Sequence, residues 1–175
     1  MRVIEHRRHT MRVKPGDHLS QAGVDLARRV GGTLGRYDLV VTSPVARAYE
    51  TAIAMGFAVD ELWPALAPLP DEVYDEADWE KGCAEYARAA RLGGATADYL
   101  TGLAEVFQAL ARRLPEGSRA LVISHGGVVE AATVAYLPDK DYSGWDTSCD
   151  YCEGVRLYLV NGHFSDAEAL TVQVA

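Results

Sequence analysis

The stretch Ala120-Leu121-Val122-Ile123-Ser124-His125-Gly126-Gly127 decides the fold of this chain. Four apolar residues in a row, ended by small and polar ones, are typical of a short strand that is buried on both faces. A further helix is predicted to begin after the two glycines. Buried strands that alternate with helices belong to α/β proteins, in which helices cover both faces of a parallel or mixed sheet.

The same pattern occurs twice nearer the N-terminus. Val3-Ile4 begins one short strand, and residues 38–42 form an apolar run rich in β-branched residues. Between them, after a loop with Pro15-Gly16-Asp17, apolar residues recur at helical spacing behind an expected Ser20 N-cap. Pro44 suits the first turn of a second helix. The chain therefore begins as strand, helix, strand, helix.

The second half of the chain continues the alternation. A helix is predicted from a core stripe with steps of three and four: Leu100, Leu103, Phe107, Leu110 and Leu114. Two late strands are expected at residues 155–160 and 170–174, joined around Asn161-Gly162. The segment 64–82 is rich in proline and acids, and we expect it to be mostly irregular.

Length and composition limit the class of protein. A chain of 175 residues predicts one domain over residues 1–175. With 49% hydrophobic and 24% charged residues, the composition is that of an ordinary globular protein. The formal charge is −8, from 17 Lys and Arg against 25 Asp and Glu. Such a chain gains nothing from counterion release, so nucleic acid is not an expected partner.

The sequence has no pattern typical of a membrane span, a signal peptide or a closed metal site. The apolar runs are too short to span a bilayer, and no apolar segment follows the charged N-terminus, so we expect a cytoplasmic protein without a membrane partner. Its three cysteines are an odd number, which does not suggest a disulfide framework. Cys149 and Cys152 form a lone C-x-x-C without a second ligand pair. We expect two unpaired thiols there rather than a metal site.

Candidate chemistry gathers where the predicted strands end. His9 and His125 each follow a strand, and Arg47 lies near the start of a helix that follows another. In open α/β sheets the ligand crevice lies at the carboxyl ends of the strands. With Arg8, these residues form a positive cluster that suits a phosphoryl group, beside which a neutral imidazole suits a nucleophile. Taken singly, each histidine would more often be a hydrogen-bonded core residue, and Arg47 would suit a solvated helix face.

The sequence resembles the histidine phosphatase superfamily, also called the phosphoglycerate mutase-like family, in four motifs and in their order. The motifs are Arg8-His9-Thr10, Leu19-Ser20-Gln21-Ala22-Gly23, Thr42–Ala52 and Ser124-His125-Gly126-Gly127. The resemblance implies a three-layer α/β/α sandwich with a mostly parallel sheet and no cofactor or metal. It implies that His9 accepts the phosphoryl group, that Arg8 and Arg47 bind it, and that His125 stabilises it. It also places Thr10 and the backbone of Gly126 beside the substrate.

Two positions depart from the family pattern. Thr10 stands where the family usually has glycine, and a β-branched residue is tolerated there only if its φ is negative. The family's acid before a Gly-x-Trp-like stretch has no clear counterpart before residues 78–82. Glu72 matches its spacing best and is the predicted general acid, with Asp71, Asp75 and Glu76 as alternatives.

The sequence thus predicts a phosphatase that hydrolyses a small-molecule or protein phosphomonoester through a phosphohistidine on His9. A phosphomutase, and a phosphate-binding or regulatory protein with little turnover, stay open as alternatives. Specificity is expected from residues 56–98 and from the loop 138–152. In that loop Tyr142, Trp145 and Tyr151 would line a pocket or form a contact between subunits of a homo-oligomer. We expect surface or supporting roles for His6 and Arg7, and exposure for His18 and His163.

Overall fold

The computed structural model describes residues 1–172 and contains a mixed sheet with the strand order β3-β2-β4-β1-β5-β6. Its strands are β1 (Arg2–Arg8), β2 (Leu39–Thr42), β3 (Glu61–Leu62), β4 (Arg119–Ser124), β5 (Gly154–Val160) and β6 (His163–Leu170). The first four run parallel to one another, whereas β5 is antiparallel to both β1 and β6. This confirms the mostly parallel sheet.

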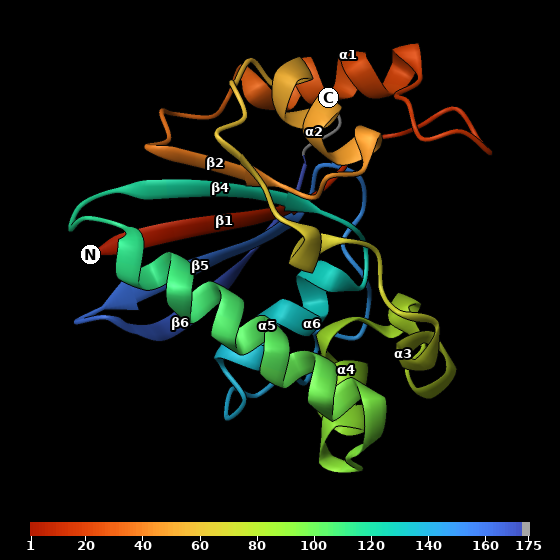
Figure 1. The fold of residues 1–175 in the computed structure, drawn as a ribbon, viewed down its shortest axis with the longest axis vertical. Helices are drawn as coiled ribbons and strands as arrows, with labels where there is room; N and C mark the ends of the chain where they lie inside the picture. The colour runs from red at the N-terminus through yellow and green to blue at the C-terminus, as the bar shows by residue number, and fades with distance from the viewer. Residues whose placement is uncertain (173–175) are drawn as a thin grey trace.

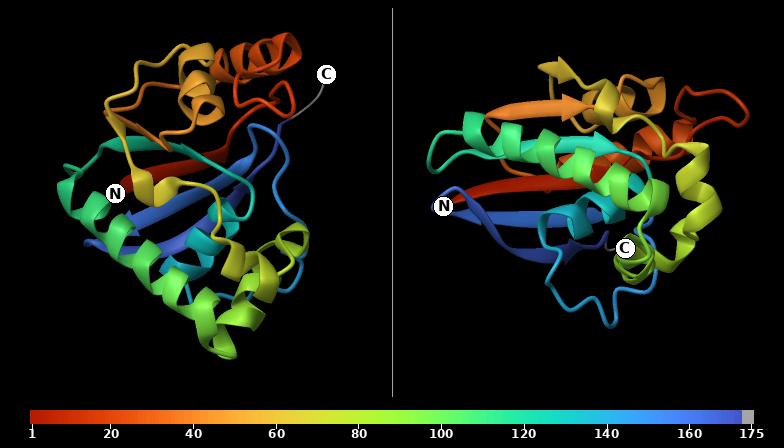
Figure 2. Two further views of the ribbon diagram at one scale, coloured as in Figure 1. Left: turned by 45° about the vertical axis from the view of Figure 1, so that its right-hand side comes forward. Right: turned by 60° about the horizontal axis from the view of Figure 1, so that its bottom comes forward.

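Helices cover both faces of the sheet, which confirms the three-layer architecture (Figures 1 and 2). On one face lie α1 (Gln21–Gly31) and α2 (Ala46–Ala54), and on the other lie α4 (Gly82–Arg91), α5 (Gly94–Arg113) and α6 (Val128–Tyr136). The short helix α3 (Asp71–Glu76) lies beyond the end of the sheet toward which β1 points (Figure 1).

Strand β4 connects the two hydrophobic cores. Leu121 and Ile123 pack with α1 and α2, whereas Ala120 and Val122 belong to the core under α5. Successive side chains of a strand point to opposite faces, so each core receives every second residue. All four are fully buried, as expected for a strand covered on both sides. The predicted stripe of α5 is buried in the larger core.

The N-terminus of α1 is capped as the sequence predicted, whereas α2 begins later than predicted. The Ser20 side chain caps α1 by accepting the N–H of Gly23 at 3.1 Å. Helix α2 begins only at Ala46, so Pro44 precedes the helix rather than lying in its first turn. The Ser43 hydroxyl accepts the N–H of Val45 at 3.3 Å, and the resulting turn delays the helix.

Two expectations for irregular or late segments were wrong. Residues 64–82 contain α3 and two 3₁₀ turns, Pro64–Leu66 and Trp79–Lys81, all too short to give a periodic hydrophobic signal. The last described strand is β6 and not residues 170–174, of which 173 and 174 lie outside the described residues. Asn161 and Gly162 both have positive φ, the conformation of a two-residue hairpin turn, so β6 pairs directly after β5. No helix within residues 1–172 has the length and apolar character needed to cross a membrane.

Candidate active site

The sheet brings three loop segments to one edge. His9 follows β1, Ser43 follows β2 and His125 follows β4, and these three strands are neighbours. The ladder continues past the strand ends, because the N–H of His9 donates to the Ser124 carbonyl at 2.9 Å. The N–H of Ser43 donates to the Ile123 carbonyl at 2.9 Å in the same way. The predicted site segments therefore meet at the carboxyl ends of the strands.

The buried ring of His9 is held through both of its nitrogens. Nδ1 lies 2.6 Å from the carbonyl oxygen of Thr10, so Nδ1 carries the proton and donates it. Nε2 then carries the lone pair, which accepts the Nε–H of Arg47 at an N···N distance of 3.2 Å. Burial, followed by the positive charges of Arg47 and Arg8, lowers the pKa of His9 to about 4. The imidazole is therefore neutral at pH 7, with Nε2 as its basic atom.

Arg47 comes from the first turn of α2 and reaches two partners. Its Nε contacts His9, and its Nη1 forms an ion pair with the carboxylate of Asp17. Asp17 belongs to the loop between β1 and α1, so this arginine joins three segments of the chain. The guanidinium fork lies where two oxygens of a phosphoryl group on Nε2 could be bound together.

Arg8 is held between two aromatic rings. Its guanidinium carbon lies 4.4 Å from the centroid of the Tyr151 ring and 5.3 Å from that of Trp79. Nη1 donates to the carbonyl of Cys149 at 3.0 Å. The buried Nε has no hydrogen-bond partner within residues 1–172. The Nε–H of Arg8 would therefore be a free donor for an anionic ligand.

His125 packs edge-on against His9, with ring centroids 5.3 Å apart. Its Nε2 lies 2.8 Å from the Ser43 hydroxyl. Burial and the nearby His9 lower the pKa of His125 to about 2, so this ring is also neutral at pH 7. When Ser43 donates to Nε2, the ring proton is on Nδ1, a buried atom without a partner in the described part of the chain. That N–H would be a second free donor for a phosphoryl oxygen.

Thr10 and Gly126 shape the site in different ways. The N–H of Thr10 donates to Thr51 at 3.0 Å, and its hydroxyl donates to the carbonyl of Gly23 at 2.9 Å. Both of its donors are thus used within the protein, and its carbonyl orients the His9 ring. The predicted contact of Thr10 with substrate stays a prediction. In the described residues the positive-φ non-glycine positions are Cys152 and Asn161, so threonine at position 10 is not strained.

Gly126 is a place of close approach. A Cβ atom at this position would lie 2.7 Å from the Trp79 ring and 3.2 Å from Nε of Arg8. Only glycine lets both side chains pack against the turn that follows His125.

The sequence model of the histidine phosphatase superfamily (branch 1) matches residues 5–165. This chain belongs to that superfamily. The matched range includes every segment that contributes to the cluster around His9.

Solved structures resemble the whole chain of this superfamily member. Phosphoserine phosphatase from Entamoeba histolytica has a TM-score of 0.72, with 16% identity over 99% of this chain and 98% of that chain. A mycobacterial glucosyl-3-phosphoglycerate phosphatase has a TM-score of 0.67, with 17% identity over 99% and 100%. A protein from Thermus thermophilus has a TM-score of 0.62, with 23% identity over 97% and 99%. At these identities the likeness shows the fold. No curated protein sequence matches the chain.

The four carboxylates that the sequence offered as the general acid have different surroundings in this histidine phosphatase superfamily member. Glu72 is exposed and makes no hydrogen bond or ion pair among residues 1–172. Glu76 caps α5 instead, because its carboxylate accepts the N–H groups of Ala95 and Thr96 at 2.9 and 2.7 Å. Asp71 and Asp75 are exposed as well. Asp17 is the carboxylate that contacts the cluster.

Sequence reasoning placed some supporting residues and missed others. Of the two alternatives for His6, a surface position is wrong and a supporting position fits, because His6 is buried with Nε2 2.6 Å from the hydroxyl of Ser124, the residue before His125. Arg7 is buried too and pairs with Glu5. Of the loop aromatics, Tyr151 lies over Arg8 as a pocket residue would, whereas Tyr142 is buried and donates to the Thr133 carbonyl. Asp17 lies outside the four motifs, and its nearness in sequence to Arg8-His9 was the available signal, whereas Thr51 lies within the Thr42–Ala52 motif without a predicted role.

The C-x-x-C segment serves the site through its backbone. Arg8 donates to the Cys149 carbonyl, and its own carbonyl accepts the N–H of Cys152 at 3.1 Å. The buried Glu130 carboxylate of α6 accepts the N–H groups of Cys149 and Gly127, each at 2.7 Å. The cysteines are free thiols, and residues 1–172 contain no group of three or more metal-ligating side chains.

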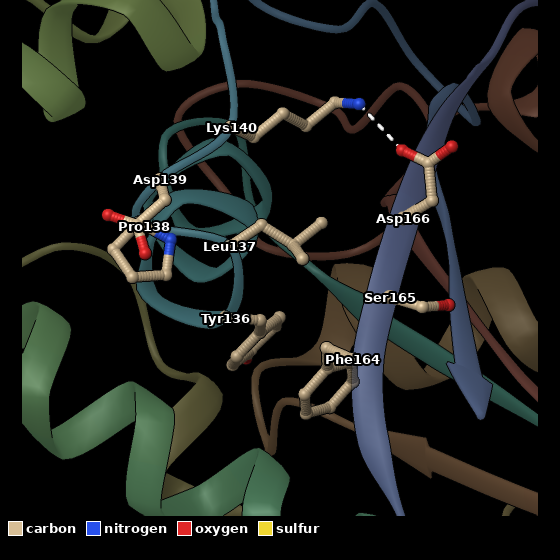
Figure 3. Close-up of a pocket in the computed structure, with 8 residues that line it drawn as sticks. All are labelled: Tyr136, Leu137, Pro138, Asp139, Lys140, Phe164, Ser165 and Asp166. Atoms are coloured by element: carbon tan, nitrogen blue, oxygen red, sulfur yellow. Dashed lines mark hydrogen bonds and ion pairs between the residues drawn. The ribbon is translucent and has the colours of Figure 1, made fainter. Parts of the chain in front are cut away.

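A separate hollow of about 370 Å³ lies between the loop after α6 and strand β6 (Figure 3). Lys140 reaches across it to Asp166 at 2.6 Å, and Tyr136 and Phe164 stack with centroids 4.7 Å apart. Its lining residues do not include His9, Arg8, Arg47 or His125. The candidate chemistry of this superfamily member thus lies at the strand ends and not in this hollow.

Proposed function

We propose that this chain is a phosphomonoester hydrolase that works through a phosphohistidine on His9. The observation that carries the proposal is the state of the His9 ring. Thr10 fixes the proton on Nδ1, and Nε2 presents its lone pair beside the guanidinium of Arg47. A neutral imidazole with one fixed tautomer is an activated nucleophile, and arginines beside it neutralise the charge of a transferring phosphoryl group.

In the first step Nε2 of His9 attacks phosphorus and the bond from phosphorus to the leaving oxygen breaks. The Nδ1–H···O bond to Thr10 strengthens as the ring becomes positive, since a charged donor makes the stronger hydrogen bond. Arg8 and Arg47 bind the phosphoryl oxygens, and Nδ1–H of His125 is available for a third contact. The leaving oxygen takes a proton and departs as an alcohol.

In the second step a water oxygen attacks phosphorus and the bond from phosphorus to Nε2 breaks. The electron pair returns to Nε2, and the water proton passes to a base. The products are inorganic phosphate and the original neutral imidazole. Two of the structures that share this fold are named as phosphatases, which supports hydrolysis as the reaction class.

The experiment is to trap the intermediate with a ³²P-labelled phosphomonoester. A phosphohistidine is identified because its label is lost in acid and retained in base, and peptide mapping then locates the labelled residue. We expect label on His9, together with release of inorganic phosphate over many turnovers. His9→Gln should lose the label, whereas the exposed control His163→Gln should keep it.

The two alternatives give other products from the same experiment. A phosphomutase would return the label to an isomer of the substrate rather than to phosphate. A phosphate-binding protein would retain inorganic phosphate at equilibrium without any turnover. Label on His125 alone would contradict the assignment of the nucleophile.

A further inference from the structure

The side chain of Arg47 lies between Asp17 and the candidate nucleophile His9 and interacts with both. Its carboxylate forms an ion pair with Nη1 of Arg47, and Nε of the same guanidinium lies 3.2 Å from Nε2 of His9. A phosphoryl group bound by this guanidinium would therefore lie beside both Nε2 and the Asp17 carboxylate. Asp17 is half exposed, whereas His9 is buried, so Asp17 stands at the mouth of the site and His9 at its floor.

The loop that carries Asp17 is fixed on α2. Glu50, one turn after Arg47, accepts the N–H of Leu19 at 2.9 Å and contacts Nδ1 of His18 at 2.6 Å. Within the loop, Nη1 of Arg12 donates to the carbonyls of Pro15 and Gly16 at 3.0 and 2.7 Å. The direction of Asp17 is therefore set by contacts that do not involve its own side chain.

The remaining acids near the site are engaged elsewhere or point to solvent. Glu76 caps α5, and Glu130 binds two backbone N–H groups of the scaffold. Glu72, which the motif spacing favoured, makes no hydrogen bond or ion pair with the cluster in residues 1–172. Among the described carboxylates, Asp17 alone forms a hydrogen bond or an ion pair with one of the residues Arg8, His9, Arg47 or His125.

We infer that Asp17 is the proton donor to the leaving oxygen and the base for the attacking water, an inference that rests on the proposed function. When a phosphoryl dianion takes the place of Asp17 on Arg47, the carboxylate loses its cation and faces a second negative group. That environment favours the protonated acid, which takes a proton from solvent. The leaving oxygen departs on the side of phosphorus opposite Nε2, toward the mouth where Asp17 stands.

The proton balance closes over the two steps. As the bond from phosphorus to oxygen breaks, the leaving oxygen keeps the electron pair and takes the proton of the Asp17 carboxyl. The resulting carboxylate then accepts a proton from the water that attacks the phosphohistidine. The bond from phosphorus to Nε2 breaks with its pair returning to nitrogen. When phosphate leaves, Asp17 returns its proton to solvent and forms the ion pair with Arg47 again.

The test compares Asp17→Asn on two probe substrates, an alkyl phosphate such as glycerol phosphate and the activated p-nitrophenyl phosphate. An alkoxide needs a proton to leave, whereas a nitrophenolate of low pKa does not. We expect kcat/KM to fall by about 10²- to 10⁴-fold for the alkyl ester but by less than about fivefold for the aryl ester. For the alkyl ester, the decrease of kcat at high pH that the wild-type enzyme shows should also be absent from the variant. Glu72→Gln is the matched control and should slow both substrates equally or not at all.

The outcomes separate this inference from the function on which it rests. A wild-type chain that labels His9 and releases phosphate, while Asp17→Asn slows both substrates equally, overturns the role of Asp17 alone. The selective loss appearing in Glu72→Gln instead would overturn it too. A wild-type chain that neither labels nor turns over would overturn the proposed function and this inference together. Asp17→Asn is expected to fold, because Glu50 and Arg12 hold the loop without the Asp17 side chain.

Discussion

The hydroxyl oxygen of Thr51 accepts a hydrogen bond from the backbone N–H of Thr10 at 3.0 Å. The same hydroxyl donates to the carbonyl of Arg47 at 2.6 Å, one turn earlier in α2. Thr51 thus joins the residue that orients His9 to the helix that carries Arg47.

We expect Thr51→Val to damage the site although it keeps the shape of the side chain. The N–H of Thr10 would be buried without an acceptor, which costs about 1–3 kcal/mol. The free energy of unfolding in urea should fall by that amount, and kcat/KM should fall further than this loss explains. Thr51→Ser retains the hydroxyl and is the control. Equal behaviour of the two variants would show that the hydroxyl is dispensable.

Arg47→Lys is expected to behave as a severe substitution. A lysine ammonium lacks the Nε–H that meets His9 and cannot form a two-pronged contact with phosphoryl oxygens. We expect kcat/KM to drop by about 10²-fold or more, in the range typical of a lost electrostatic donor. Arg29→Lys on the exposed side of α1 should leave activity unchanged. Unchanged kinetics in Arg47→Lys would exclude Arg47 from phosphoryl binding.

Stability should fall in acid because three histidines are buried in the neutral form. Burial lowers the pKa of His6 to about 3, against about 6.5 in an unfolded chain. Between these values the unfolded state binds more protons, so the free energy of unfolding decreases as the pH falls below 6.5. The linkage relation gives about 2 kcal/mol for His6 alone at pH 5. His9 and His125 act with the same sign.

Urea denaturation of wild type and His6→Gln at pH 7.5 and 5.0 checks this. The variant should lose about 2 kcal/mol less than wild type between the two pH values. His18 is a control of opposite sign, because its exposed ring pairs with Glu50 and its pKa is raised. His18→Gln should therefore not reduce the loss of stability. An identical pH dependence in His6→Gln would mean that His6 binds a proton in the folded state.

Glu130→Gln should weaken substrate binding from a distance. The carboxylate holds the backbone of Cys149, whose carbonyl in turn accepts Nη1 of Arg8. The amide of a glutamine has one acceptor oxygen, so its NH₂ group would face the N–H of either Cys149 or Gly127. The unpaired N–H should reduce the free energy of unfolding by about 1–3 kcal/mol. We expect KM to rise more than kcat falls, because Arg8 loses its fixed position. The exposed Glu105→Gln should change neither quantity.

The sequence contained most of the scaffold and the centre of the site. Buried strands such as residues 120–123 are recognisable because four apolar residues in a row need cover on both faces. His9, Arg8, Arg47 and His125 follow strand ends, and parallel strands bring their ends to one edge of the sheet. These placements need only the local pattern and the order of elements.

Contacts between distant segments could not be predicted in the same way. Residues 71–76 have the acids of a solvated loop, and only the three-dimensional contact of Glu76 with the start of α5 shows that one of them is a cap. Asp17 lies in a turn of ordinary composition, and its meeting with Arg47 depends on Glu50 fixing the loop to α2. Each of these contacts joins residues about 20 or more positions apart.

The packing of Trp79 against Arg8 gives this protein an internal optical reporter. Indole fluorescence responds to nearby charge, and the guanidinium lies 5.3 Å from the ring centroid. An oxyanion that binds Arg8 would offset the positive charge beside the indole and change its emission. Titration with vanadate or inorganic phosphate could therefore measure occupancy without turnover, even in variants that have lost their nucleophile. Trp79→Phe would identify the signal against the background of the other two tryptophans, Trp63 and Trp145.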